Sequence, residues 1–101
     1  MAQQPQPIIY GQVFNDDLAA DGATVSIFPA LNETDIIQDI VGPSGNFGLT
    51  SFFKLNLFNL VSDLSEGDEI IIFATNGDKE AEATYIYDPA DGAVYRQLLL
   101  D

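Results

Sequence analysis

Three observations predict an all-β fold for this chain of 101 residues, a seven-stranded antiparallel Greek-key β-sandwich. Apolar and polar residues alternate along short runs, as they do in strands that bury one face. Clusters of Gly, Pro, Asn and Asp separate these runs at intervals of roughly eight to twelve residues. No stretch combines a sustained helical period with capping residues. The length fits one domain, which we place at residues 8–101, after a flexible arm or linker at residues 1–7.

The expected strands cover residues 8–14, 23–28, 35–41, 46–57, 69–75, 80–87 and 94–100. Asn76-Gly77-Asp78-Lys79 predicts a tight hairpin, with Asn76 and Gly77 at the two positions that need a positive φ. The leucines between residues 55 and 64 have helical spacing, but Asn, Ser and Asp interrupt them. We therefore expect a loop there, with at most one helical turn.

Alternation assigns an inward set to the core: Ile9, Gly11, Val13, Ala23, Val25, Ile27, Phe47, Leu49, Phe53, Leu55, Leu57, Ile70, Ile72 and Ala74. Gly11 lacks the side chain that its strand position would bury. It indicates either a bulge or a close approach of neighbouring backbones.

Aromatic residues occupy positions where a solvated sandwich should carry polar ones. The set comprises Tyr10, Phe14, Phe28, Phe52, Phe58, Phe73, Tyr85 and Tyr87. One explanation is that central strands are covered on both sides, or that the register slips by one residue. The other is an exposed aromatic contact face for another subunit or module. The sequence leaves both explanations open.

Charge and composition exclude several classes of function. Sixteen acidic residues face only Lys54, Lys79 and Arg96, which gives a net charge of −13. Such a surface repels nucleic acid and anionic lipid, so we expect neither as a partner and no membrane insertion. The chain has no Cys and no His, and no serine has a neighbouring base. We therefore expect no enzyme, no catalytic residue and no cofactor.

The order of the glycine-containing motifs resembles the carboxypeptidase regulatory-like (transthyretin-like) modules of bacterial and archaeal surface proteins. The motifs are IYGQVFNDD at residues 9–17, DGATVSIF at 21–28, GPSGNFGL at 42–49 and GDEIIIFATNGDKEAEATYIY at 67–87. The resemblance implies an Ig-like or transthyretin-like sandwich that is extracellular or on the cell surface and is not catalytic. It carries over no functional residue, because such modules share a scaffold rather than a site.

Four local features suggest further sites. Asp16, Asp17 and Asp21 form an acidic cluster that could hold calcium, although solvated acidic loops are the simpler explanation. Asn32-Glu33-Thr34 is an N-glycosylation sequon. An amide crosslink between Lys and Asn or Asp is disfavoured, because Lys54 points away from the core and Lys79 lies in a turn. The last strand either pairs within the domain, which we favour, or completes a neighbour's sheet.

These features lead to two hypotheses. The first is a structural or assembly module that associates with itself or with neighbouring copies, through an aromatic face or through edge strands. The alternative is an adhesive module that binds carbohydrate or calcium, with Tyr10, Tyr85, Tyr87 and Tyr95 stacking on sugar rings. An engineered scaffold is a third reading that the sequence leaves open.

Overall fold

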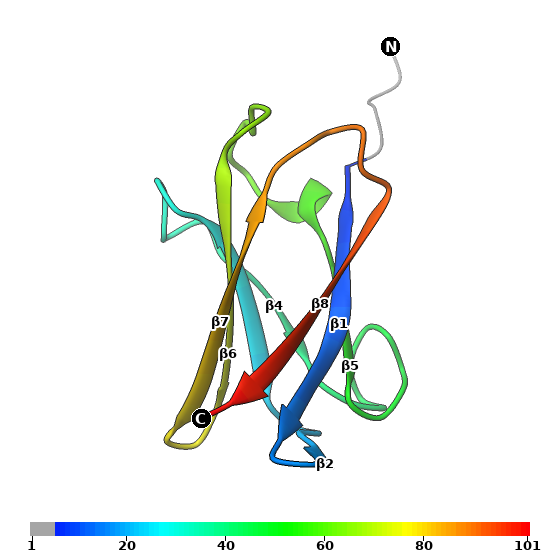
Figure 1. Ribbon diagram of the computed structural model, residues 1–101. Coiled ribbons are helices and arrows are strands. Elements are labelled where there is room, and N and C mark those ends of the chain that lie inside the picture. The colour runs from blue at the N-terminus through cyan, green and yellow to red at the C-terminus, as the bar shows by residue number, and fades with distance from the viewer. Residues whose placement is uncertain (1–5) are drawn as a thin grey trace.

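The computed structural model describes residues 6–101, and within them the regular structure is almost entirely β (Figure 1). The strands are β1 (Ile8–Asn15), β2 (Leu18–Ala19), β3 (Thr24–Pro29), β4 (Ile37–Ile40), β5 (Phe52–Asn56), β6 (Glu69–Asn76), β7 (Lys79–Ile86) and β8 (Ala93–Leu100). A single turn of 3₁₀ helix, η1 (Leu57–Asn59), follows β5. The all-β prediction is confirmed.

The strands form two sheets that pack face to face (Figure 1). In sheet A, β1 lies between β5 and β8, and β2 folds back on the end of β1. Sheet B has the order β4-β3-β6-β7 and is antiparallel throughout. The prediction of a fully antiparallel sandwich is wrong at one place, because β1 and β8 run parallel over their whole length. Parallel neighbours need a long connection, and here the chain between them builds all of sheet B.

The described residues contain eight strands rather than the expected seven, because β2 is a two-residue strand. The turn before it is Asp16-Asp17, and Asp16 has a φ of 58°. An aspartate tolerates this left-handed conformation better than most residues do. The predicted loop at this position is therefore a short β-hairpin.

The expected strand at residues 46–57 is shortened to Phe52–Asn56. Gly48 and Ser51 have φ values of 80° and 69°, which no continuing strand allows. The inward assignments of two residues in this loop are consequently wrong. Phe47 is half-buried and Leu49 is 53% exposed.

The predicted hairpin at Asn76-Gly77-Asp78-Lys79 is confirmed, but the expectation that Asn76 takes a positive φ is wrong. Asn76 pairs with Lys79, so the two turn residues are Gly77 and Asp78. Gly77 alone of these two has a positive φ, at 66°. This is the pattern of a turn with glycine at its first central position, rather than the Asn-Gly turn predicted from the sequence.

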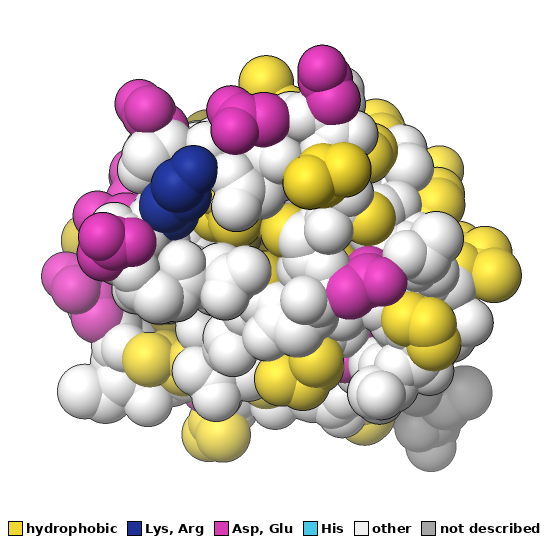
Figure 2. Space-filling view, turned by 90° about the horizontal axis from the view of Figure 1, so that it is seen from below, with side chains coloured by type: hydrophobic (Ala, Val, Ile, Leu, Met, Phe, Trp, Pro, Cys, Tyr) yellow, Lys and Arg dark blue, Asp and Glu magenta, His cyan; other side chains and the backbone are white. Residues whose placement is uncertain are grey.

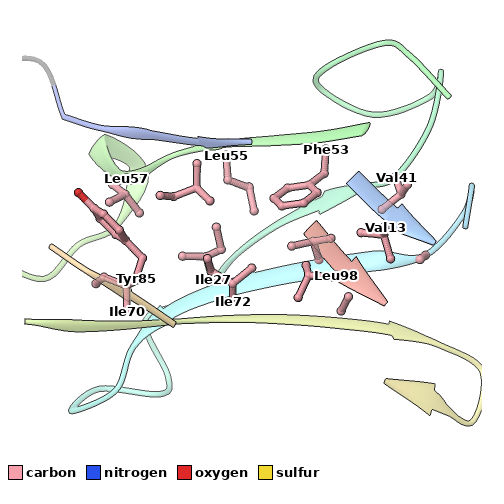
Figure 3. Close-up of a cluster of buried hydrophobic side chains, with 14 of the residues drawn as sticks. Val13, Ile27, Val41, Phe53, Leu55, Leu57, Ile70, Ile72, Tyr85 and Leu98 are labelled. Carbon is pink, nitrogen blue, oxygen red and sulfur yellow. The ribbon is translucent and has the colours of Figure 1, made fainter. Parts of the chain in front are cut away.

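The core lies between the sheets and takes alternate residues from both (Figure 3). Val13 of β1, Phe53 of β5 and Leu98 of β8 point into the interior from sheet A, and Ile27 of β3 and Ile72 of β6 point into it from sheet B. Every other expected inward residue, apart from Phe47 and Leu49, is buried as predicted. Burying each large side chain of this kind contributes about 1.5–3 kcal/mol to folding.

The domain begins earlier than residue 8. Pro7 is fully buried, and its carbonyl accepts a hydrogen bond from the Leu57 N–H at 3.2 Å. The Tyr87 hydroxyl bonds to the Gln6 side chain. Residues 6 and 7 therefore belong to the folded unit, and the rest of the expected arm lies outside the described residues.

Candidate contact surface

Four aromatic rings form a continuous row on the outer face of sheet A, which we call face A. The row comprises Tyr95, Tyr10, Phe47 and Phe52. The Tyr10 ring centroid lies 5.5 Å from that of Tyr95 and 6.1 Å from that of Phe47. Phe47 and Phe52 stack with centroids 4.6 Å apart. Three rings are half-buried and Tyr95 is 41% exposed, so the row is open to solvent.

The strand register builds this row. Even-numbered residues of β1 point away from the core because the odd-numbered ones fill it. Tyr10 is directly beside Tyr95 of β8 in the parallel ladder, and Phe52 of β5 is paired with Gln12, two residues farther along β1. Phe47 comes from the loop before β5 and lies against Phe52. The left-handed residues that shorten β5 therefore also add a fourth ring to face A.

The Gln12 side chain makes two hydrogen bonds beside the aromatic row. Its side-chain amide donates to the Ser51 hydroxyl at 3.0 Å, and its carbonyl oxygen accepts from the Tyr95 hydroxyl at 2.6 Å. These bonds fix the edge of the Tyr95 ring and tie the loop before β5 to β1. The rings are therefore held in place before any partner arrives, which reduces the entropy lost on binding.

Face A carries no acidic residue in a protein that is otherwise strongly acidic. The strands β1, β5 and β8 contain no Asp or Glu, although the chain has sixteen. They do contain Lys54 and Arg96, two of the three basic residues. Seen from the end that holds the β6–β7 hairpin, acidic side chains are most frequent at the left and top of the view, and hydrophobic side chains show over much of the remaining surface (Figure 2). The strands of sheet B carry Asp39, Glu69, Glu80 and Glu82, and the other twelve acidic residues lie in the turns and loops or at the end of the chain.

The predicted aromatic face is divided among four places. Tyr10, Phe14 and Phe52 lie half-buried on face A. Phe28 and Phe73 lie half-buried on the outer side of sheet B. Phe58 is 53% exposed and lines a pocket of about 320 Å³ beside η1, at the end of the sandwich. The idea of a single contact face with all eight rings is therefore wrong.

Tyr85 and Tyr87 were assigned to the aromatic face, but they belong to the core, where each is only 3% exposed. The odd-numbered residues of β7 face inward, which reverses the expected register of this strand. The Tyr85 hydroxyl donates to Asp91 Oδ2 at 2.8 Å, and burial raises its pKa to about 12. Neither ring is available for stacking on a sugar.

Two residues of the row, Phe47 and Tyr95, were not included in the contact face predicted from the sequence. Phe47 was assigned to the core, and Tyr95 was considered only as a sugar-stacking ring. The signal for Tyr95 is its place next to Tyr10, which depends on the parallel pairing of the first and last strands. No local pattern encodes that pairing.

The acidic loop predicted to hold calcium does not gather its carboxylates. Asp16 and Asp17 are exposed in the hairpin turn, whereas Asp21 accepts bonds from the Thr50 hydroxyl at 2.6 Å and the Ser51 N–H at 2.7 Å. These bonds lower the Asp21 pKa. Within residues 6–101, no group of three or more acidic side chains is placed to share a metal ion.

The other suggested sites have clear positions. Asn32 is exposed, donates to the Ser62 hydroxyl at 3.2 Å and accepts from the Thr34 hydroxyl at 2.9 Å. Lys54 is exposed on face A. Lys79 donates to Asn15 Oδ1 at 2.8 Å and so joins the start of β7 to the end of β1. This pair has the residue types of a crosslink, but the hydrogen bonds of both side chains bring no carboxyl group to it.

Comparison with models of known protein families finds no match to this sequence, and comparison with curated proteins finds none either. No helix among the described residues is long and apolar enough to cross a membrane.

Proposed function

We propose that this chain is a non-catalytic structural module that assembles with neighbouring copies of itself through face A. The observation that carries the proposal is an open row of aromatic rings on an acid-free sheet in a protein with a net charge of −13. Two copies that meet through any acidic surface repel each other. Two copies that meet through face A bury aromatic surface and bring no carboxylates on the strands together.

A two-fold symmetric contact suits this surface. In such a contact each patch meets its own copy, so a face must be complementary to itself. Uncharged rings and the amides of Gln12 and Gln97 satisfy this condition, because an amide both donates and accepts hydrogen bonds. Lys54 is the one charged side chain that points outward on β5.

The ring geometry favours a protein partner over a carbohydrate. Sugar rings stack on flat, open aromatic faces, but Tyr10 and Tyr95 meet at 62° and Phe47 covers one face of Phe52. The two other tyrosines of the sugar-binding hypothesis lie in the core. We therefore treat carbohydrate binding as an alternative that the experiment below can detect.

The fold supports a module of the carboxypeptidase regulatory-like, transthyretin-like kind, which we propose is extracellular or on a cell surface. Each sheet combines strands that are distant in sequence, with β3 next to β6 and β1 between β5 and β8. This arrangement supports our proposal of a Greek-key topology. The described chain enters at one end of the sandwich and leaves at the other (Figure 1). A strand-built module with that layout is suited to serve as a spacer or assembly unit.

The experiment is light scattering coupled to size exclusion at low and high salt, on the wild type and on Tyr10→Glu. We expect wild-type self-association that strengthens with salt, since salt screens the repulsion between copies. Tyr10→Glu should weaken it about tenfold or more, because each contact contains the substitution twice. The matched control, Phe73→Glu on the outer side of sheet B, should associate as the wild type does. A strictly monomeric wild type at both salts contradicts the proposal. Calorimetric binding of a glycan that Tyr10→Glu abolishes would favour the alternative.

A further inference from the structure

The edge strand β7 of sheet B and the edge strand β8 of sheet A lie side by side and then diverge; we call the gap between these two edges the seam. At one end they are joined, because Asp101 N–H donates to the Glu80 carbonyl at 3.0 Å and Glu80 N–H to the Asp101 carbonyl at 3.4 Å. Beyond that pair, β7 and β8 share no ladder, since β7 continues in sheet B and β8 in sheet A. The seam therefore leaves one side of each strand without a neighbouring strand.

The parallel ladder determines which groups of β8 face this seam. Ile8 N–H donates to the Gly92 carbonyl at 3.1 Å, so the even-numbered residues at the start of β8 direct their backbone groups toward β1. The odd-numbered residues Tyr95, Gln97 and Leu99 consequently direct theirs toward the seam. Unpaired edge groups of this kind are a template for an added strand.

Arg96 occupies the seam. Its Nη1 donates to the Tyr95 carbonyl on β8 at 2.9 Å, and its Nε lies 3.4 Å from the Thr84 carbonyl on β7. The guanidinium carbon lies 5.8 Å from the centre of the Tyr85 ring, within the range of a cation–π contact. The Arg96 side chain thus donates a hydrogen bond to one carbonyl on each of the two edges, as the N–H groups of a neighbouring strand would.

The opposite side of the sandwich is covered without an arginine. On β5, the Phe52 carbonyl accepts from Gly42 N–H at 3.0 Å, and the Lys54 carbonyl accepts from the Asn46 side chain at 3.0 Å. Lys54 N–H donates to Asp39 Oδ2 at 2.9 Å. Oδ1 of the same carboxylate accepts a hydrogen bond from the Ile40 N–H of β4 at 2.8 Å. This side offers little backbone to a second chain.

The β8 edge differs from that of β7 in charge. β7 carries Glu80 and Glu82 with exposed side chains, whereas β8 has no acidic residue. In a protein with a net charge of −13, two copies can pair their β8 edges without bringing carboxylates of these strands together. Another β8 is therefore the strand that this edge fits.

We propose that Arg96 closes the β8 edge against strand addition by the β8 of a second copy, and so directs assembly to face A. Removing the guanidinium frees the Tyr95 carbonyl and opens the seam. The expected consequence is edge-to-edge pairing of two antiparallel β8 strands, a different contact from the face-to-face one.

The test uses Arg96→Ala in the Tyr10→Glu background, so that association through face A is already disabled and failure of the two proposals can be told apart. Tyr10→Glu/Lys79→Ala is the matched control, since it also removes one positive charge and Lys79 lies outside face A. Sedimentation velocity measures association, and hydrogen exchange followed by NMR reports on individual backbone amides. We expect at least tenfold stronger association for the Arg96→Ala variant than for the control, with slowed exchange at Gln97 and Leu99.

Equal association in the two double variants would overturn the proposal, as would association without slowed exchange on β8. Tyr10→Glu/Arg96→Lys keeps the charge but lacks the planar fork that reaches two carbonyls, so it should also associate, more weakly than the alanine variant. If Arg96→Ala fails to fold, the lysine variant decides the question. Unfolding of both variants would contradict the proposal, because Arg96 would then be required for the stability of the fold and not specifically for blocking strand addition at β8.

Discussion

Gly11 is the position where the parallel pairing of β1 and β8 is most sensitive to substitution. A Cβ added there would lie 1.7 Å from the Arg96 carbonyl oxygen and 2.8 Å from its carbon, both backbone atoms. Ordinary van der Waals contacts begin near 3.4 Å. In Gly11→Ala, the distance from the new Cβ to the Arg96 carbonyl oxygen must therefore increase to about twice the 1.7 Å available in the wild type. No side-chain rotation relieves the clash, and β8 must move away from β1.

The cost follows from the bonds that such a movement breaks. Two or three ladder hydrogen bonds beside the site contribute about 0.5–1.5 kcal/mol each. Together with strain around Leu98, whose side chain is buried in the core, we expect Gly11→Ala to lower the free energy of unfolding by about 3–5 kcal/mol. For a domain of this size each kcal/mol shifts Tm by about 4–8 °C, so Tm should fall by more than about 12 °C.

Thermal unfolding followed by circular dichroism, together with urea titration, measures this loss. Gly92→Ala is the matched control, because a Cβ there meets no atom within 4 Å and its φ is not in the left-handed region. It should be neutral or stabilise the fold by up to about 1 kcal/mol. A Gly11→Ala variant within about 0.5 kcal/mol of the wild type would refute the close β1–β8 approach.

The remaining predictions concern the core, the sheet edge and titration. Phe53→Ala should cost about 3–5 kcal/mol in urea titration, since Phe53 is fully buried between the sheets; a loss below about 1 kcal/mol would place the ring elsewhere. Asp39→Asn should cost about 1.5–3 kcal/mol, because one carboxylate oxygen becomes an NH2 group that cannot accept, so at least one of the three N–H bonds is lost; equal stability would argue against the closed β4–β5 side. Hydrogen bonds from the Thr50 hydroxyl and Ser51 N–H lower the pKa of Asp21, and those from the Ser62 hydroxyl and Val61 N–H lower that of Asp35, below the ordinary 3.8. Their stabilisation is therefore present above about pH 3.8 and lost as the pH falls through the lower folded values, so stability measured against pH should drop below that point; Asp21→Asn and Asp35→Asn should flatten the drop. In an absorbance titration, Tyr85 should ionise near pH 12, and a Tyr85→Phe variant should lose that late step.

Period-two alternation was sufficient to assign most of the core. It placed Ile9, Val13, Val25 and Ile72 on inward faces because each strand buries one side, and this requirement is local. It failed on β7, where Ala81 and Ala83 are small and Ile86 is apolar but 55% exposed, so the sequence pattern supports either register. Tyr85 and Tyr87 were assigned to the wrong face for that reason.

The candidate contact surface was only partly predictable. Tyr10, Phe14 and Phe52 could be recognised as outward aromatics, since their strand neighbours are clearly inward. The position of Phe47 depends on left-handed backbone at Gly48 and Ser51, and serine gives no sequence signal for that conformation. The pairing of Tyr10 with Tyr95 joins residues from opposite ends of the chain. Such long-range pairing is decided by the whole fold rather than by a local motif.

The central claim is that a second copy binds face A. Amide and aromatic NMR spectra recorded over a dilution series test it most directly, because they locate the contact without any substitution. The account predicts concentration-dependent shifts at Tyr10, Phe52 and Tyr95 that grow with salt, and constant signals at Phe28 and Phe73. Shifts confined to the outer side of sheet B, or spectra that do not change with concentration at either salt, would contradict it.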